Sequence, residues 1–251
     1  MNASRKRDIL KLFDRSEALS VKDLAAQLGC SESSVRRDLI DLDKQGLLTK
    51  VHGGAVRIAD DVSVEDKELA ERMALFPDDK RAVAAIAAQL IEEGDVVYLD
   101  AGTTVSFVID ALTVRHATFV TNSHPHAERL AARGYTVYVI GGEFKAKTGA
   151  YVGALATKIL EQYHFSIGLF GTNGISTSVG FSTPDEREAA VKHAALSRCD
   201  RAYILSDHSK FNRSAFVSFA ALSDAVVVTD SAPEGWQNLV RLITPDSSAR
   251  R

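Results

Sequence analysis

Residues 30–39 read Cys30-Ser-Glu-Ser-Ser-Val-Arg-Arg-Asp-Leu39, and this run has the pattern of an amphipathic helix with one basic face. Ser31 is a typical N-cap, because its hydroxyl can accept a hydrogen bond from an early backbone amide, and Gly46 is typical of the left-handed residue that ends a helix. Val35 and Leu39 are one helical turn apart and form an apolar stripe. The stripe predicts burial against the core of a small domain.

The opposite face of this helix is polar. Arg37 lies almost opposite the stripe, and the other outward candidates are Ser33, Ser34, Arg36 and Lys44. Arginine can pair bidentately with guanine in the major groove of DNA, whereas hydroxyls and lysine hold phosphates without reading bases. A pair of arginines on a helix is more often a solvated surface, so the DNA-binding interpretation depends on the surrounding sequence.

Two further helices are expected before this one. Val21–Leu28 follows Ser20, a typical N-cap, and ends at Gly29, which permits a tight turn. Ser4–Arg15 carries apolar residues on one side and supplies a third helix. Three such helices predict a helix-turn-helix unit.

A short hairpin is expected after the last helix. Leu47–Val51 and Ala55–Ile58 have strand character, and His52-Gly53-Gly54 between them supplies the backbone freedom of a turn. This pattern is typical of the wing of a winged helix-turn-helix domain. Lys50 and His52 are its candidate DNA contacts.

Length and charge divide the chain of 251 residues into two domains. Through residue 57 the sequence has 11 Lys and Arg against 8 Asp and Glu, whereas the whole chain has a net charge of −3. Positive charge is therefore concentrated where DNA is expected. The expected boundaries are 1–58 for the DNA-binding domain, 59–78 for a charged linker and 79–251 for the second domain.

Composition excludes several other classes of protein. Cys30 and Cys199 are far apart and indicate neither a zinc site nor a disulfide framework. His124 and His126 are the only close histidine pair, and we expect two solvated side chains rather than metal ligands. No run approaches the roughly 20 apolar residues of a membrane span, so we expect a cytoplasmic protein without a metal ion or cofactor.

The second domain alternates short apolar strands with helices. The expected strands are Val96–Asp100, Thr118–Thr121, Thr136–Ile140, Ser166–Phe170, Arg201–Ser206 and Ala225–Thr229. This order predicts an α/β fold with a largely parallel sheet covered on both faces. Such sheets bind ligands at the carboxyl ends of their strands.

Polar loops follow the first five of these strands. The candidate ligand contacts are Asp100, Gly102, Thr103 and Thr104 after the first, Thr121, Asn122 and Ser123 after the second, Gly142 after the third, Gly171 and Asn173 after the fourth, and Asp207 and Lys210 after the fifth. Glycines allow a ligand to approach the backbone closely, and hydroxyls and the backbone amides at a helix N-terminus can donate hydrogen bonds to an anion. The loops predict a phosphate site, although a single Gly-Thr-Thr turn is more often simple capping.

Glu188 and Lys192 are four residues apart on the helix expected after Pro184. This spacing is typical of a surface ion pair, which is the interpretation that the residues alone favour over a role in the ligand site.

The motifs together resemble the DeoR family of bacterial transcription regulators. The resemblance rests on Ser31-x-x-Ser34-Val35-Arg36-Arg37-Asp38-Leu39 with His52-Gly53-Gly54-Ala55, and on Asp100-Ala-Gly-Thr-Thr104, Thr121-Asn-Ser123, Gly141-Gly142, Gly171-Thr-Asn-Gly-Ile175, Glu188-Ala189 with Lys192, and Asp207-x-Ser-Lys-Phe211. The family usually has Arg where Lys50 stands, so we expect this wing to hold phosphate rather than to read a base.

The resemblance implies a repressor of carbohydrate catabolism genes that binds double-stranded operator DNA as a homodimer or homotetramer. It also implies a second domain related in fold to ribose-5-phosphate isomerase that binds a phosphorylated sugar, and it moves Glu188 and Lys192 into the candidate pocket. Pro184-Asp185 is similar to members that respond to fructose phosphates. Two alternatives remain: the same DNA contacts would serve an activator, and the acids and bases of the second domain would serve an isomerase-like enzyme.

Overall fold

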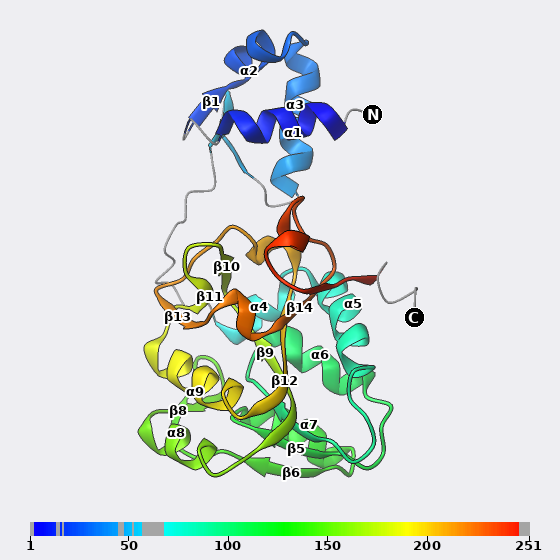
Figure 1. Cartoon of the computed structure of the whole chain (residues 1–251), viewed down its shortest axis with the longest axis vertical. Coiled ribbons are helices and arrows are strands. Elements are labelled where there is room, and N and C mark those ends of the chain that lie inside the picture. The colour runs from blue at the N-terminus through cyan, green and yellow to red at the C-terminus, as the bar shows by residue number, and fades with distance from the viewer. Residues whose placement is uncertain are drawn as a thin grey trace.

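The computed structural model describes residues 3–13, 16, 18–44, 48–51, 53–56 and 68–245. Gly46, His52 and residues 59–67 of the expected linker therefore lie outside the described residues. Figure 1 shows a small N-terminal domain at one end of the long axis and a larger α/β domain at the other. Within the described ranges, no helix has both the length and the apolar character needed to cross a membrane.

The N-terminal domain packs three helices against a small antiparallel sheet. The elements are α1 (Ala3–Phe13), α2 (Val21–Leu28), α3 (Glu32–Lys44), β1 (Ala18–Ser20), β2 (Thr49–Val51) and β3 (Gly54–Val56). Ile9, Leu24, Val35 and Leu39 are fully buried in a shared core. The apolar stripe of the sequence is therefore the inner face of α3.

Both predicted ends of α2 and the predicted start of α3 form, whereas the predicted end at Gly46 lies outside the described residues. The Ser20 hydroxyl accepts from the Asp23 amide at 3.1 Å, and Gly29 has a left-handed φ of 61°. The Ser31 hydroxyl accepts from the Ser34 amide at 3.3 Å. These local bonds set where α2 ends and α3 begins.

The wing contains a strand that the sequence did not reveal. β3 lies between β2 and β1, so the hairpin is extended to a three-stranded sheet by residues that precede α2. A Cβ atom on Gly54 would lie 2.2 Å from the Leu19 carbonyl oxygen. Gly54 is therefore needed for strand pairing, and Gly53 before it has the left-handed φ of 87°.

The second domain contains seven parallel strands in the order β15-β14-β12-β9-β4-β5-β6. Their bounds are β4 (Val96–Leu99), β5 (Thr118–Thr121), β6 (Thr136–Val139), β9 (Phe165–Gly171), β12 (Cys199–Ser206), β14 (Val226–Thr229) and β15 (Leu242–Ile243). Six of them lie where the sequence predicts strands, and the two-residue β15 was missed. The predicted α/β fold class is confirmed.

Helices cover both faces of this sheet, as Figure 1 shows. They are α5 (Pro77–Ala88), α6 (Thr103–Ala111), α7 (His124–Ala132), α8 (Ala154–Leu160) and α9 (Glu186–Leu196). The short helix α4 (Leu69–Ala74) precedes them and has no buried residue. Along β4, Val97 and Leu99 pack in one core with α5 and α6, whereas Tyr98 packs in the other with α8 and α9. Adjacent residues of a strand face opposite sides, so β4 is buried on both.

Short antiparallel strands are added outside the main sheet. They are the hairpin β7 (Glu143–Lys145) with β8 (Ala150–Val152), and a second sheet of β10 (Gly174–Ser176), β11 (Gly180–Thr183) and β13 (Val217–Ala220). An isolated bridge joins Ser123 to Ala150, which brings the hairpin to the carboxyl end of β5. These additions form walls around that edge of the sheet.

Candidate functional site

The outward face of α3 carries the candidate DNA contacts. Ser33, Arg37 and Lys44 are exposed, and Lys50 on β2 is exposed as well. Arg36 is also exposed, but its guanidinium bonds Glu32 of the same helix at 2.9 Å. Ser34 is half-buried and bonds the Ser31 hydroxyl at 3.0 Å. Arg37 is therefore the strongest candidate for contacting bases. Arg36 could bind a DNA phosphate only after its ion pair with Glu32 is broken.

Two ion pairs between helices hold α3 in place. Asp38 is buried at 6% exposure and pairs with Arg5 of α1, and Lys6 bonds Asp41 at 2.8 Å. Asp38 was not singled out from the sequence, because its partner lies 33 positions away on another helix. These bonds fix the angle at which α3 presents its basic face.

A second site lies at the carboxyl end of the parallel sheet and is built around Asp100. One carboxylate oxygen of Asp100 accepts from the Gly171 amide at 2.9 Å and from the ammonium of Lys192. The same ammonium donates to the Gly171 carbonyl at 3.1 Å. Asp100 and Lys192 are 2% and 6% exposed, so this is a buried ion pair with several bonds to satisfy it.

Two glycines let the loops after β4 and β9 touch. A Cβ on Gly102 would lie 3.1 Å from the Gly171 Cα, and a Cβ on Gly171 would lie 3.2 Å from the Gly102 Cα. Neither loop has room for a side chain at this point. The glycines are therefore required for loop packing, in addition to any approach of an anion.

The loops enclose a small, partly open pocket. Its lining residues are Arg72, Asp100, Ala101, Gly102, Asn122, Thr148, Ala150, Gly171, Asn173, Glu188 and Lys192. The free interior has room for about one water molecule. A ligand larger than a single water therefore requires side chains of the lining to move.

The expected surface pair of Glu188 with Lys192 is wrong. Both side chains are buried, and each has a partner from a distant segment. Glu188 accepts from the Thr148 hydroxyl at 2.8 Å and from the Lys145 ammonium at 3.1 Å, whereas Lys192 bonds Asp100. The i,i+4 spacing brings both residues into one pocket but does not pair them.

Seven of the fourteen predicted ligand contacts line this pocket, and seven do not. The seven outside it are Thr103, Thr104, Thr121, Ser123, Gly142, Asp207 and Lys210. Several have structural partners instead: the Thr121 hydroxyl donates to the Leu99 carbonyl at 2.6 Å, the Ser123 hydroxyl caps α7, and Asp207 accepts from the Ser209 amide and hydroxyl. Thr103 and Thr104 are buried in the first turn of α6.

Besides Lys145, the sequence did not single out Arg72 and Lys80, two further basic residues near the pocket. Arg72 lines it from α4, a helix that lies in the expected linker. Lys80 of α5 is 3% exposed and donates to the Arg72 carbonyl. Burial lowers the pKa of Lys80 to about 8, although the nearby Asp207 charge opposes the shift. Neither residue belongs to a recognisable motif, so only the packing of α4 and α5 reveals them.

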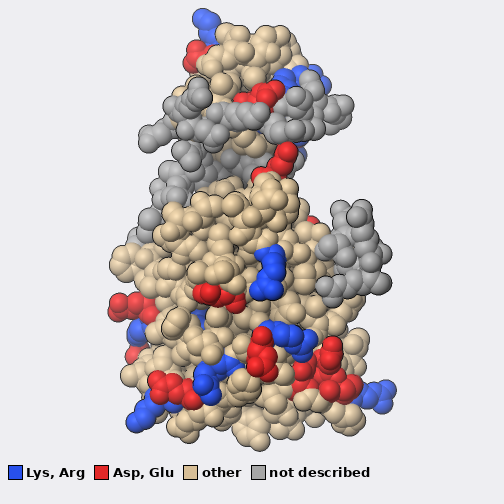
Figure 2. Space-filling view, viewed as in Figure 1, with Lys and Arg blue, Asp and Glu red and all other residues tan. Residues whose placement is uncertain are grey.

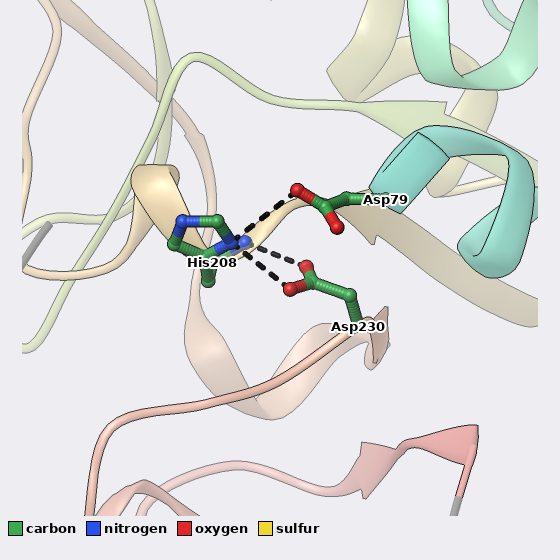
Figure 3. A group of neighbouring side chains, drawn as sticks. All are labelled: Asp79, His208 and Asp230. Carbon is green, nitrogen blue, oxygen red and sulfur yellow. Dashed lines mark hydrogen bonds and ion pairs between the residues drawn. The ribbon is translucent and has the colours of Figure 1, made fainter. Parts of the chain in front are cut away.

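A cluster of His208, Asp79 and Asp230 lies at the same edge of the sheet (Figure 3). The His208 Nδ1 is 2.9 Å from an Asp230 oxygen and 3.8 Å from an Asp79 oxygen. The bond to Asp230 raises the pKa of His208, while burial and the Asp230 charge raise that of Asp79. These residue types also bind metals, but here Nδ1 already bonds a carboxylate. The cluster ties the start of α5 to the ends of β12 and β14.

Of the two histidines expected to be solvated, one is exposed and the other is buried. His124 is exposed, but His126 is 3% exposed and its Nδ1 atom has no hydrogen-bond partner. Burial lowers the pKa of His126 to about 4, against the pull of the nearby Asp100 charge. The expectation of two solvated side chains is therefore wrong for His126.

This burial predicts a loss of stability in acid. The folded pKa of His126 is about 4, below the unfolded value of 6.5. Burial of the neutral imidazole therefore costs no stability above pH 6.5, and the free energy of unfolding decreases as the pH falls from 6.5 towards about 4. At about 1.4 kcal/mol per pH unit the loss approaches about 3 kcal/mol. We expect urea titrations at pH 7 and pH 4.5 to show a smaller decrease in His126→Gln than in the parent. His124→Gln is the control, and equal decreases in parent and His126→Gln would contradict the prediction.

Charge over the larger domain is mixed. In the view of Figure 2, acidic and basic side chains alternate across its surface without a broad field of one sign. The face seen in this view therefore gives no general attraction for a polyanion.

A winged helix-turn-helix domain followed by a parallel α/β domain defines a class of DNA-binding transcriptional regulators. The signature of the "DeoR-like helix-turn-helix domain" matches residues 5–61, and that of the "DeoR C terminal sensor domain" matches residues 76–231. The chain therefore belongs to the DeoR family of transcriptional regulators. Members of this family are transcriptional regulators, so the enzyme alternative is set aside.

Similar proteins span almost the whole chain. A regulator from Bacillus subtilis described as "Uncharacterized HTH-type transcriptional regulator FruR" is 37% identical and covers 90% of each chain. The lactose phosphotransferase system repressor of Staphylococcus epidermidis is 33% identical over 89% of this chain and 90% of its own. The regulator GlpR of Haloferax volcanii is 34% identical over 91% and 89%.

Solved structures with a similar chain path include ribose 5-phosphate isomerase A from Neisseria gonorrhoeae. It is 18% identical, covers 55% of this chain and 53% of its own, and has a TM-score of 0.40. A similarity this distant supports no statement about activity.

Proposed function

We propose that this protein represses genes of carbohydrate metabolism and is released from its operator by a phosphorylated sugar. The observation that carries the proposal is the pocket around Asp100, where buried acid, amide and ammonium groups converge at the carboxyl edge of a parallel sheet. The names of the relatives, among them a lactose phosphotransferase system repressor, support a link to sugars.

The pocket chemistry favours a polar, anionic ligand. Lys192 and Arg72 supply positive charge, Asn122 and Asn173 supply amides, and Asp100 can accept from sugar hydroxyls. Since the free space is small, binding requires rearrangement of the lining. A ligand that fits the rearranged state better shifts the population towards it, and reduced operator affinity follows if that state holds DNA poorly.

A fructose phosphate is the first candidate within this class. The support is the Pro184-Asp185 pair before α9, in which Asp185 caps the helix that carries Glu188 and Lys192, together with the relative described as FruR. We further propose that the DNA-bound form is a homo-oligomer, because symmetric operators are read by paired recognition helices.

Fluorescence anisotropy tests the proposal directly. Labelled DNA from upstream of the protein's own gene is compared with scrambled DNA, with and without fructose 1-phosphate, fructose 6-phosphate and ribose 5-phosphate. We expect specific binding that one of these compounds reverses. Specific binding that no phosphosugar changes would contradict the proposed effector class, and steady turnover of a phosphosugar would return the isomerase-like alternative.

A further inference from the structure

We propose that Asp79, His208 and Asp230 bind a divalent transition-metal ion such as Zn²⁺, for which imidazole and carboxylate are suitable ligands. The three residues come from the first turn of α5 and from the segments that follow β12 and β14. None of them lines the pocket around Asp100. The inference therefore goes beyond the proposed function and does not depend on it.

The distances among the three side chains match the spacing of metal ligands. The His208 Nδ1 lies 2.9 Å from an Asp230 oxygen and 3.8 Å from an Asp79 oxygen, and the three ligand atoms lie within 4.8 Å of one another (Figure 3). Two ligands of a tetrahedral Zn²⁺ ion are about 3.3–3.6 Å apart when the bonds are about 2.0–2.2 Å long. Small rotations of the side chains would therefore place three ligands around one ion.

A proton on the imidazole leaves this arrangement incompletely bonded. The Nδ1 atom donates to Asp230, whereas its distance of 3.8 Å to Asp79 is too long for a hydrogen bond. The two carboxylates also repel each other: burial and the Asp230 charge raise the pKa of Asp79. A divalent cation bound to Nδ1 would replace the proton and attract both carboxylates at once.

Neighbouring groups hold two of the three ligands in position. One Asp230 oxygen accepts from the His208 backbone amide at 2.8 Å, and the other accepts from the Ser231 hydroxyl at 3.1 Å. The His208 ring packs edge-on against Phe76, with 5.3 Å between the ring centroids. Metal affinity depends on such neighbours, because they fix the orientation of the ligating side chains.

An unpaired carboxylate oxygen next to the cluster is a second observation that points to a cation. Asp207 directly precedes His208 and is 0% exposed, and within the described residues its Oδ2 atom has no hydrogen-bond partner. The buried ammonium of Lys80 donates to the Arg72 carbonyl instead. The bond to Asp230 is the main cause of the raised pKa of His208, but the Asp207 charge adds to it and thus reaches the same site. A buried carboxylate oxygen without a partner is costly, and a nearby cation reduces that cost.

Sequence spacing could not reveal this group, and the sequence predicted no metal ion. The three ligands come from distant segments and form no short motif. An exposed pair elsewhere in the domain shows what the group adds: the His164 Nε2 is 3.0 Å from an Asp200 oxygen, but among the described residues this pair belongs to no group of three possible ligands. The His164 pair therefore serves as a natural control.

The test compares Asp79→Asn with the parent in the full-length protein, after a chelator has been used and removed. The Asp79 side chain is 38% exposed and asparagine has a similar size, so this variant should keep the fold. Asp78→Asn is one control, because Asp78 is an acid in the same first turn of α5 and is exposed. His164→Gln is the other. Calorimetry measures binding of Zn²⁺ at pH 7, and thermal unfolding is followed with and without Zn²⁺.

We expect the parent to bind one Zn²⁺ ion saturably and to unfold at a higher temperature when Zn²⁺ is present, because the ion joins three segments of the folded domain. Asp79→Asn should bind Zn²⁺ at least about 10- to 100-fold more weakly, since loss of a residue that merely orients a ligand already has an effect of that size. His208→Gln should lose binding as well, and circular dichroism checks its fold. Both controls should bind like the parent.

Absence of saturable Zn²⁺ binding by the parent would overturn the inference, and so would parent-like binding in Asp79→Asn. Equal weakening in His164→Gln would show that Zn²⁺ binds exposed pairs in general, which also removes the site. Competition by equimolar Mg²⁺ would overturn the assignment to a transition metal, because Mg²⁺ prefers oxygen ligands. None of these outcomes involves a sugar phosphate or DNA, so they are independent of the proposed function.

Discussion

Arg37→Ala is expected to lower the affinity of the protein for its operator by about 1–3 kcal/mol per recognition helix, which is roughly 5- to 150-fold. Arg37 is exposed on the face of α3 opposite the buried Val35 and Leu39, so its loss removes a base contact without opening the core. Anisotropy with labelled operator measures the change. Binding of the sugar phosphate should be unaffected, because α3 contributes nothing to the pocket.

Two comparisons distinguish a contact between Arg37 and bases from nonspecific electrostatic attraction to DNA. Arg81→Ala removes the same charge from the second domain and should leave operator affinity unchanged. Affinity for scrambled DNA should fall much less than affinity for the operator in Arg37→Ala, since phosphate contacts carry no sequence information. Equal operator affinity in Arg37→Ala and parent would remove Arg37 from the recognition surface.

Lys192→Met is expected to destabilise the second domain by about 3–5 kcal/mol, because it leaves the Asp100 carboxylate buried without a cation. Asp100 is 2% exposed, and the Gly171 amide also donates to the oxygen that Lys192 contacts. The double variant Asp100→Asn with Lys192→Met should recover much of this loss, since the uncompensated charge is then absent. Urea titrations at pH 7 measure both free energies of unfolding.

The control for this ion pair lies on the same helix. Arg187 of α9 bonds Glu143 at 2.7 Å and lies 3.5 Å from Asp185, and the Arg187 and Glu143 side chains are 42% and 65% exposed. Solvent screens such a pair, so Arg187→Met should cost no more than about 1 kcal/mol. A loss in Lys192→Met no larger than that in Arg187→Met would show that the Asp100 ion pair is not a structural requirement.

The recognition helix and the sheet could be predicted from sequence because their signals are local. Ser31 caps α3 through an amide three residues away, and Val35 and Leu39 share a face because a helix repeats every 3.6 residues. The strands of the second domain are short apolar runs between helices, so their order implied a parallel sheet with its polar loops at one edge. Asp100, Gly102, Asn122, Gly171 and Asn173 meet there as a consequence.

The partners within the pocket could not be predicted, because they depend on directions that sequence spacing does not encode. Helical spacing placed Glu188 and Lys192 on one face, and a surface pair was the reasonable expectation. Only the packing of α9 against the sheet brings Lys192 to Asp100, 92 positions earlier in the chain. Burial then decides the pairing, since a desolvated ammonium needs the carboxylate that the interior provides.

The sequence by itself thus determined the two domains, the basic face of α3 and the edge of the sheet where a ligand is expected. The tertiary structure alone decided that Arg72 enters the pocket from α4, that His126 is buried and that the Thr103 and Thr104 hydroxyls lie outside the pocket lining. The physical reason is range: caps and periodicity act within a few residues, whereas burial and charge pairing join groups that the chain brings together only when it is folded.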